Sequence, residues 1–205
     1  MNGVAQRNEA VVGPEEHSIT QADSLAEFVA RVSYDDLSNQ AREVLKAHVL
    51  DALGCAVGGL AGEPIAMLRR QIEEFGGHPL CTLVGGGMTA PDRAAVYNTA
   101  LVRYLDFNDS YLAPGETCHP SDNLGAVLAA SEYAGVEGRD FLVALAVAYQ
   151  VQCRLSGEAP VRARGFDHTT QGAYAVAAGE SRRRSASRPS SLPTQWPWPA
   201  WPTMP

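Results

Sequence analysis

The sequence predicts an all-α fold, an alanine-rich bundle of short helices, and three observations favour it. Apolar residues recur at three- and four-residue steps along most of the chain. The apolar segments are rich in alanine and leucine, which favour helices. One short stretch, CTLVGGG at 81–87, has the β-branched residues and closing glycines of a small strand or turn. We therefore expect helices to provide most of the regular structure.

Composition narrows the class of protein. The chain has 205 residues, enough for one domain with a core and part of a second. Hydrophobic residues make up 45% of it, which excludes disorder throughout, and the net charge of -7 argues against nucleic acid as a partner. No apolar run reaches the roughly 20 residues of a membrane span, and the N-terminus lacks the pattern of a secretion signal. The four cysteines form no CxxC pair, which predicts reduced thiols in a cytoplasmic protein.

The first part of the chain is expected to contain a mobile tail at 1–19 and then three helices. Thr20 or Asp23 is suited to cap the first helix, which runs to about Ser33. The second, at about 38–60, ends in DALGCAVGGL, and these small residues suggest close contact with another helix. The third is expected from Pro64 to Phe75.

The fourth expected helix opens at Ala90-Pro91-Asp92 and brings Asp106 and Asp109 to its C-terminal end. Carboxylates there oppose the helix dipole by about 0.3–1 kcal/mol each, so they need a partner or a use. The remaining expected helices lie at 124–134, at 141–155 and from Thr169 onward, and the whole helical domain is expected to span 20–179.

The segment Tyr104–Asn123, YLDFNDSYLAPGETCHPSDN, separates two of these helices. It holds several carboxylates and hydroxyls, an imidazole and a thiol, and such groups are costly to bury unless they find partners. Loops held by a rigid scaffold often carry function. We therefore expect a functional site to include this segment.

His119 in this segment and His168 before the last helix are the candidate proton-transfer groups, because imidazole exchanges protons near pH 7. The alternative is that each histidine makes only a structural hydrogen bond. A hard-cation site at Asp106, Asp109 and Glu116 is disfavoured, because the spacing is not that of an EF-hand and the chain has no HExxH or CxxC motif. No metal is expected.

Three other features have simpler interpretations. Glycines 85–87 lack the Lys-Ser/Thr of a phosphate-binding loop and are expected to form a turn. Cys118 could be a nucleophile beside His119, but adjacent side chains usually point apart, so a bystander is expected. Three arginines are typical of solvated surface and become functional only as anchors for an acidic substrate, namely Arg154, Arg162 and Arg164.

Three motifs in consistent order, LDALGCAVGGL, LDFNDSYLAPGETCHPSDN and GFDHTTQGAYAVAAG, resemble the MmgE/PrpD family between about Thr20 and Gly179. That family includes 2-methylcitrate dehydratases, cis-aconitate decarboxylases and an iminodisuccinate epimerase. The resemblance implies a large helical domain, a smaller α+β lid domain later in the chain, and homodimers. It also implies a di- or tricarboxylate substrate bound between the domains, with no metal or organic cofactor.

The resemblance also implies roles for individual residues. The aspartate of the family's LDF motif matches Asp106, a downstream hydroxyl matches Ser110, and the two site histidines match His119 and His168. We expect the histidines to supply proton transfer and carboxylate binding, with Asp106 orienting one of them. Substrate contacts are assigned to Ser110, Asp109 and Arg164. A further lysine and histidine of the family site have no counterpart here.

The leading hypothesis is a lyase of the 2-methylcitrate dehydratase type that acts on a small polycarboxylate by acid–base elimination. A family epimerase or a cis-aconitate-type decarboxylase is the first alternative. A second alternative is a non-catalytic helical interaction module, whose Pro/Trp-rich tail binds a partner through Trp196, Trp198 and Trp201.

Residues 180–205 differ in character, with every tryptophan of the chain, frequent prolines and no helical period. Family members continue instead with an ALGL-containing helix and an alanine-rich run. A shift of one base turns each Trp-Pro pair into alanine, because the last G of TGG joins the CC of proline, and it permits Ala-Leu-Gly-Leu at Arg-Ser-Ala-Ser. We therefore expect a frameshift near Gly179, with a natural tail as the alternative. A chain without the lid and part of the catalytic set is expected to have little or no activity.

Overall fold

The computed structural model describes residues 20–181. Its helices are α1 (Gln21–Arg31), α2 (Asn39–Gly59), α3 (Glu63–Phe75), α4 (Pro91–Tyr104), α5 (Leu124–Ala134), α6 (Gly138–Glu158) and α7 (Thr169–Ser181). Three short 3-10 helices are η1 (Tyr34–Asp36), η2 (Pro120–Asn123) and η3 (Arg162–Arg164). Two antiparallel hairpins pair β1 (Cys81–Thr82) with β2 (Met88–Thr89) and β3 (Tyr111–Ala113) with β4 (Glu116–Cys118). The predicted helical fold class is confirmed.

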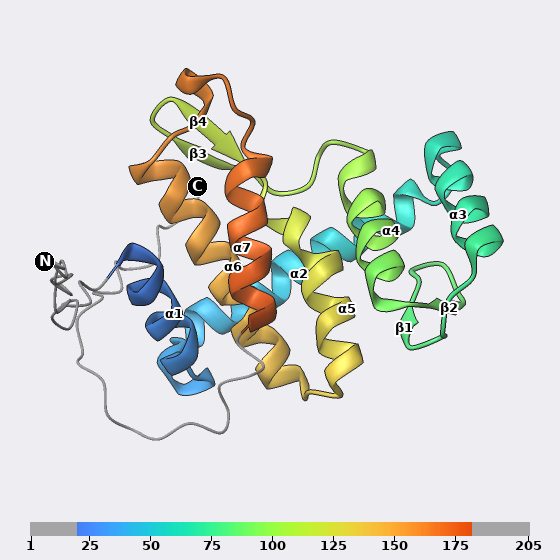
Figure 1. Cartoon of the computed structure of the whole chain (residues 1–205), viewed down its shortest axis with the longest axis horizontal. Coiled ribbons are helices and arrows are strands. Elements are labelled where there is room, and N and C mark those ends of the chain that lie inside the picture. The colour runs from blue at the N-terminus through green and yellow to red at the C-terminus, as the bar shows by residue number, and fades with distance from the viewer. Residues whose placement is uncertain (1–19, 182–205) are drawn as a thin grey trace, which may run out of the picture.

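The elements surround α6, which packs along α7 and also contacts α2 and α5 (Figure 1). A continuous stretch of α6, Val143–Tyr149, is buried, because helices cover it on several sides. The β3–β4 hairpin lies beside α6, and Figure 1 shows it at one end of α6 and α7. The β1–β2 hairpin and α3 lie on the other side of the molecule. The two hairpins therefore belong to separate regions.

The first helices begin where the sequence predicts, because their capping side chains are in place. The Thr20 side chain accepts a hydrogen bond from the Asp23 amide at 3.1 Å, and the Asp23 carboxylate accepts from the Thr20 amide at 2.9 Å. Both proposed capping residues thus act together in one capping box. The Ser38 hydroxyl accepts from the Ala41 amide at 3.1 Å and starts α2 in the same way.

Small residues allow the helices to meet closely, as the glycine-rich end of α2 predicted. A Cβ atom added at Gly59 would lie 3.0 Å from the carbonyl oxygen of Leu101 on α4. One added at Gly125 on α5 would lie 2.3 Å from the backbone nitrogen of Thr99 on α4. Since real Cβ atoms do not approach a backbone atom at 2.3 Å, the contact at Gly125 needs glycine, and the contact at Gly59 is tight for any larger residue.

The β1–β2 hairpin confirms the predicted strand or turn at 81–87. Gly85, Gly86 and Gly87 all have positive φ angles, between 86° and 114°, which side chains disfavour. The buried Asn98 of α4 holds the first strand, because its amide donates to the Thr82 carbonyl at 2.9 Å and its Oδ1 accepts from the Val84 amide at 3.0 Å.

The polar segment 104–123 is more ordered than its composition suggests. Helix α4 ends at Tyr104, so Asp106 and Asp109 lie beyond it rather than in its last turn. The rest of the segment forms the β3–β4 hairpin and η2, which the sequence analysis did not predict. Those strands were missed because each is three residues long and paired only with the other.

The end of α7 lies two residues beyond the expected domain boundary, since Glu180 and Ser181 continue the helix. The predicted mobile tail at 1–19, and 182–205 of the predicted aberrant tail, lie outside the described residues. Among the described helices, none taken singly has the length and apolar character to span a bilayer, and only α2 and α3 together pass that test, with an 88° bend between them.

Candidate functional site

The structure brings His119 and His168 together, although 48 residues separate them in the sequence. Their ring centroids lie 5.5 Å apart with an interplanar angle of 66°. His119 directly follows β4 and precedes the buried Pro120 of η2, whereas His168 directly precedes α7. The two imidazoles are therefore fixed by the ends of regular elements rather than by a long loop.

The backbone of the polar segment fixes the tautomer of His119. Its Nδ1 lies 2.9 Å from the Asp109 carbonyl oxygen and 3.2 Å from the Ser110 hydroxyl. A carbonyl can only accept, so Nδ1 carries the proton and donates it. In the neutral ring, Nε2 then has a lone pair that can accept a proton. Ser110 is thus brought beside His119, and its contact with substrate stays a prediction.

His168 has a different environment. Its side chain is only 12% exposed, and neither ring nitrogen makes a hydrogen bond within the described part of the chain. Asp167 Oδ1 lies 3.2 Å from Nδ1 and would form an ion pair with the protonated ring. The same oxygen accepts a hydrogen bond from the Thr169 amide, which lowers the pKa of Asp167. Buried ring nitrogens without a hydrogen bond are rare, and a role in a site is one explanation for them.

Asp122 is a charged group of the site that sequence reasoning did not single out. Burial raises the pKa of Asp122, while Arg103, a hydrogen bond from Asn108 and the two imidazoles act in the opposite direction without cancelling it. The Asn108 amide donates to Asp122 Oδ1 at 3.0 Å. Asp122 lies three residues after His119 in the sequence HPSD, and this closeness in sequence was the feature that could have predicted it as part of the site.

Asp109 connects the site to neighbouring elements through its buried carboxylate. One oxygen accepts from the Ser121 amide at 2.9 Å, and the other accepts from the Tyr149 hydroxyl at 2.9 Å and lies 3.2 Å from His48 Nδ1. Burial raises the pKa of Asp109, but the hydrogen bonds from His48, Ser121 and Tyr149 outweigh it, so the pKa lies below its usual value. Asp109 therefore acts as an anchor here, with its carbonyl on His119 and its carboxylate on three elements.

His48 of α2 is the other residue that sequence reasoning missed as part of this site. The hydrogen bond to Asp109 raises the pKa of His48, although burial opposes that shift. Its ring also packs against Tyr149, with centroids 5.7 Å apart. The helical periodicity placed His48 among apolar residues and gave no sign of a carboxylate partner from another element.

Two of the expected site residues are not brought to the imidazoles. Asp106 has a left-handed backbone with a φ angle of 56°, and its exposed carboxylate pairs with Arg103 at 2.6 Å. Neither imidazole contacts that carboxylate in the interactions of the described residues. Arg164 lies exposed in η3. The orienting role of Asp106 and the substrate contact of Arg164 stay predictions.

Cys118 is the last residue of β4 and is fully buried, and its expected role as a bystander stays a prediction. A hydrogen bond with the Cys153 thiol of α6 lowers the pKa of Cys118, against the effect of burial. The same contact and burial raise the pKa of Cys153. Within residues 20–181, no group of three or more His, Cys, Asp or Glu side chains could hold a metal ion.

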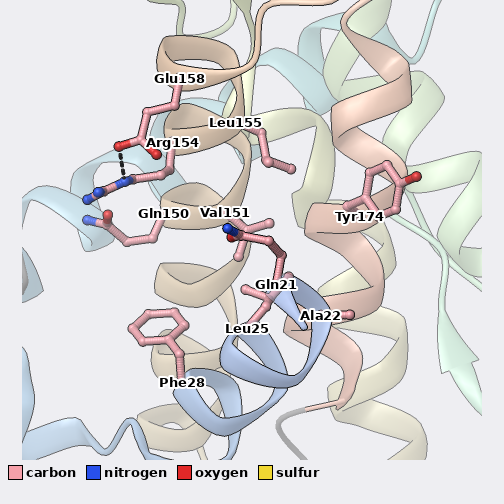
Figure 2. Close-up of a pocket in the computed structure, with 10 residues that line it drawn as sticks. All are labelled: Gln21, Ala22, Leu25, Phe28, Gln150, Val151, Arg154, Leu155, Glu158 and Tyr174. Atoms are coloured by element: carbon pink, nitrogen blue, oxygen red, sulfur yellow. Dashed lines mark ion pairs between the residues drawn. The ribbon is translucent and has the colours of Figure 1, made fainter. Parts of the chain in front are cut away.

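An apolar cavity lies away from the histidines, between α1, α6 and α7 (Figure 2). Its volume is about 290 Å³. Figure 2 shows the aliphatic side chains of Leu25, Val151 and Leu155 with Phe28 along it, and the Arg154–Glu158 ion pair at its edge. The cavity contains none of the expected site residues, so the candidate site is defined by the imidazole pair.

The fold and the site define a helical domain that presents paired imidazoles, an arrangement suited to acid–base chemistry. The chain belongs to the MmgE/PrpD family, because the MmgE/PrpD N-terminal domain model matches residues 23–188. That match ends before the first of the tryptophans.

Similar proteins carry a consistent description. The chain is 32% identical over 157 residues to "2-methylcitrate dehydratase, mitochondrial" of Yarrowia lipolytica, covering 70% of this chain and 30% of the relative. It is 30% identical over 155 residues to 2-methylcitrate dehydratase of Escherichia coli K12, covering 67% and 31%. It is 28% identical over 172 residues to 2-methylcitrate dehydratase of Cupriavidus necator, covering 70% and 32%. The chain thus spans about a third of the length of these relatives.

Proposed function

We propose that the described residues form the imidazole side of a hydro-lyase site that removes water from a small di- or tricarboxylate of the 2-methylcitrate type. The observation that carries this proposal is the His119–His168 pair. A backbone carbonyl fixes the tautomer of His119, and both ring nitrogens of His168 are buried without a hydrogen bond within the described residues. The relatives' names supply the substrate class.

In this proposal, His119 is the general base. Its Nε2 takes the proton from the carbon next to a substrate carboxylate, and the electron pair of that C–H bond forms the new double bond. The hydroxyl on the neighbouring carbon leaves with a proton donated by His168, so water is released. The protonated His119 is stabilised by the Asp109 carbonyl on Nδ1, which accepts a hydrogen bond in both protonation states.

Substrate charge needs cationic or donor groups near the imidazoles. Ser110 lies beside His119 and can donate a hydrogen bond to a carboxylate. Arg103 already bridges Asp106 and Asn108 and so holds the loop rather than standing open for substrate. We propose that further substrate contacts come from outside the described residues, which suits a chain that spans about a third of its relatives.

The first test measures binding by the 205-residue chain itself. Adding 2-methylcitrate is expected to shift the NMR ring signals of His119 and His168 while leaving those of the exposed His78 unchanged. His119→Ala or His168→Ala should abolish the response of the remaining partner, whereas the control His78→Ala should not. Equal shifts at all three histidines would contradict a specific site.

The second test measures turnover. In a full-length relative, alanine at the position of His119 is expected to lower kcat by about 10²–10⁴-fold, as loss of a general acid or base does. Unchanged turnover of 2-methylcitrate would rule out the role. The 205-residue chain by itself is expected to show little or no turnover, and clear conversion of 2-methylcitrate or cis-aconitate would contradict that.

The alternatives are separated by their products and partners. A decarboxylase releases carbon dioxide and an epimerase returns an isomer, so product analysis with an intact homologue distinguishes both from water loss. A non-catalytic module would bind a protein in a way that depends on Trp196, Trp198 and Trp201, which lie outside the described residues.

We also propose that the reading frame changes near codon 179. The sequence of the Trp-Pro pairs supports this proposal, because a shift of one base converts each pair into alanine. Resequencing the gene decides it: an intact frame that encodes Trp-Pro-Trp-Pro would end the idea. Homodimer formation likewise stays a proposal drawn from the family.

A further inference from the structure

A buried carboxylate joins the two segments that carry the histidines. Glu116 of β4 is 4% exposed, and its Oε2 accepts two hydrogen bonds from the segment that carries His168. One comes from the Val161 backbone amide at 2.8 Å, at the start of the turn that leads to His168. The other comes from the Gln171 side-chain amide at 3.1 Å, in the first turn of α7.

The positions of these partners connect them directly to the imidazoles. Glu116 lies three residues before His119, and Gln171 lies three residues after His168. Glu116 is the first residue of β4 and His119 directly follows that strand, while the His168 carbonyl accepts a hydrogen bond from the Gln171 amide at 3.1 Å. A shift of Glu116 relative to Gln171 therefore changes the separation of the rings.

Gln171 gives the carboxylate a rigid partner. Its side chain is 2% exposed, its Oε1 accepts from the Ser156 hydroxyl at 3.1 Å, and its Nε2 also lies 3.2 Å and 3.0 Å from the carbonyls of Leu155 and Ala159. These groups belong to the end of α6, so Gln171 is fixed to the central helix. Through Gln171, Glu116 thus connects the β3–β4 hairpin to helix α6 as well as to the turn at Val161.

The surroundings of the Glu116 side chain favour a group that accepts hydrogen bonds and donates none. Two donors, a backbone N–H and a side-chain NH₂, converge on one oxygen of Glu116, and a carboxylate is an acceptor only. The second oxygen is buried and makes no hydrogen bond within the described residues. Burying a carboxylate that is only half satisfied costs stability, so its presence indicates a use other than stabilising the fold.

We propose that Glu116 is a positioning residue that sets the separation of His119 and His168. This inference rests on the proposed function for its effect on turnover, but its geometric part stands alone. A glutamine at 116 can keep the acceptor oxygen and both hydrogen bonds, whereas an alanine removes them. Comparing the two substitutions therefore shows whether the hydrogen bonds of residue 116 set the separation of the rings.

The test measures the contact between the two imidazoles in the 205-residue chain by the NOE between their ring protons. Glu116→Ala and Gln171→Ala are expected to abolish the His119–His168 NOE, and Glu116→Gln is expected to restore it. The NOE between the His48 and Tyr149 rings, which lie 5.7 Å apart, should persist and reports that the fold is intact. An NOE that survives in Glu116→Ala, or is lost in Glu116→Gln, overturns the proposal.

A matched control uses the other glutamate that holds a hairpin. Glu132→Ala removes a carboxylate that accepts from the Thr82 amide and hydroxyl at 2.8 Å and 2.6 Å, far from the imidazoles, and should leave the His119–His168 NOE unchanged. Loss of the NOE in this variant as well would show a general loosening and refute the assignment. If Glu116→Ala does not fold, the Gln171→Ala variant decides, with the same two outcomes.

Turnover adds a separate result. In a full-length relative, alanine at the position of Glu116 should lower kcat by about 10²-fold, the effect of a displacement of about 1 Å in a catalytic group. Glutamine there should recover most of that loss. If the NOE behaves as expected but turnover does not change, the positioning stands and the proposed elimination chemistry fails.

Discussion

The two hairpins of the described chain are similar in size, yet different glutamates hold them in opposite ways. At β1–β2, Glu132 belongs to α5, is half-buried, and uses both carboxylate oxygens to accept hydrogen bonds from Thr82. At β3–β4, Glu116 belongs to the hairpin, is buried, and uses one oxygen for two partners. Both carboxylate oxygens of Glu132 are hydrogen-bonded and the side chain is partly exposed. Glu116 is buried, and one of its oxygens has no hydrogen bond within the described residues.

The difference shows how structural and functional uses of the same side chain can be told apart. A half-exposed, fully hydrogen-bonded carboxylate contributes modestly to stability and needs no further explanation. A buried carboxylate with one unpartnered oxygen lowers stability and is typical of positions retained for a site. The region around β3–β4 contains a second buried acid, Asp109, and the imidazole pair, and the region around β1–β2 contains neither.

The largest expected effect tests the anchor of the β3–β4 region. Asp109→Ala should lower the free energy of unfolding by about 3–5 kcal/mol, because it leaves His48, Tyr149 and the Ser121 amide without their acceptor. Chemical denaturation measures this. Asp106→Asn is the control from the same loop: it removes an exposed pair with Arg103 and should cost less than about 1 kcal/mol. Equal losses would show that the buried network has no special weight.

The next effect concerns the packing that supports the same region. Gly125→Ala should destabilise the fold by about 3 kcal/mol, since its Cβ would lie 2.3 Å from the Thr99 backbone nitrogen. Gly54→Ala on α2, where an added Cβ meets nothing within 4 Å, should instead stabilise by about 0.5–1 kcal/mol. Thermal unfolding of both variants decides, and a stable Gly125→Ala would contradict the close contact of α4 and α5.

A smaller effect is expected at β1–β2. Glu132→Ala should cost about 1 kcal/mol, the usual worth of hydrogen bonds at a half-exposed carboxylate. Binding of 2-methylcitrate, followed by NMR, should be unchanged in this variant. Weaker binding would mean that the two hairpins are coupled, and the comparison between them would fail.

The smallest effect is a pH dependence from His48. The pKa of His48 is raised in the folded chain, so its stabilising contribution is complete below the unfolded value of about 6.5 and is lost as the pH rises through the folded pKa. Unfolding free energies between pH 5 and 9 should therefore fall more steeply in the native chain than in His48→Gln. If the free energy of unfolding depends equally on pH in both proteins, the contact with Asp109 does not raise the pKa of His48.

The helices were predictable because their signals are local. The capping residues Thr20 and Ser38 and the three-to-four-residue apolar period each act within one or two turns, and the structure confirms these two helix starts. The hairpin at β3–β4 was not predictable, because strands of three residues carry too little pattern to separate from a loop.

The sequence by itself determined the helical fold and the family, and it indicated the two histidines as candidate site residues, since periodicity, caps and motif spacing are properties of neighbouring residues. Only the tertiary structure decided that Asp109 pairs with His48, that Asp106 pairs with Arg103 instead of an imidazole, and that Glu116 meets Gln171. The physical reason is that hydrogen bonds and ion pairs act over about 3 Å in space. Their partners come from helices and strands tens of residues apart, and packing of the core sets which of them meet.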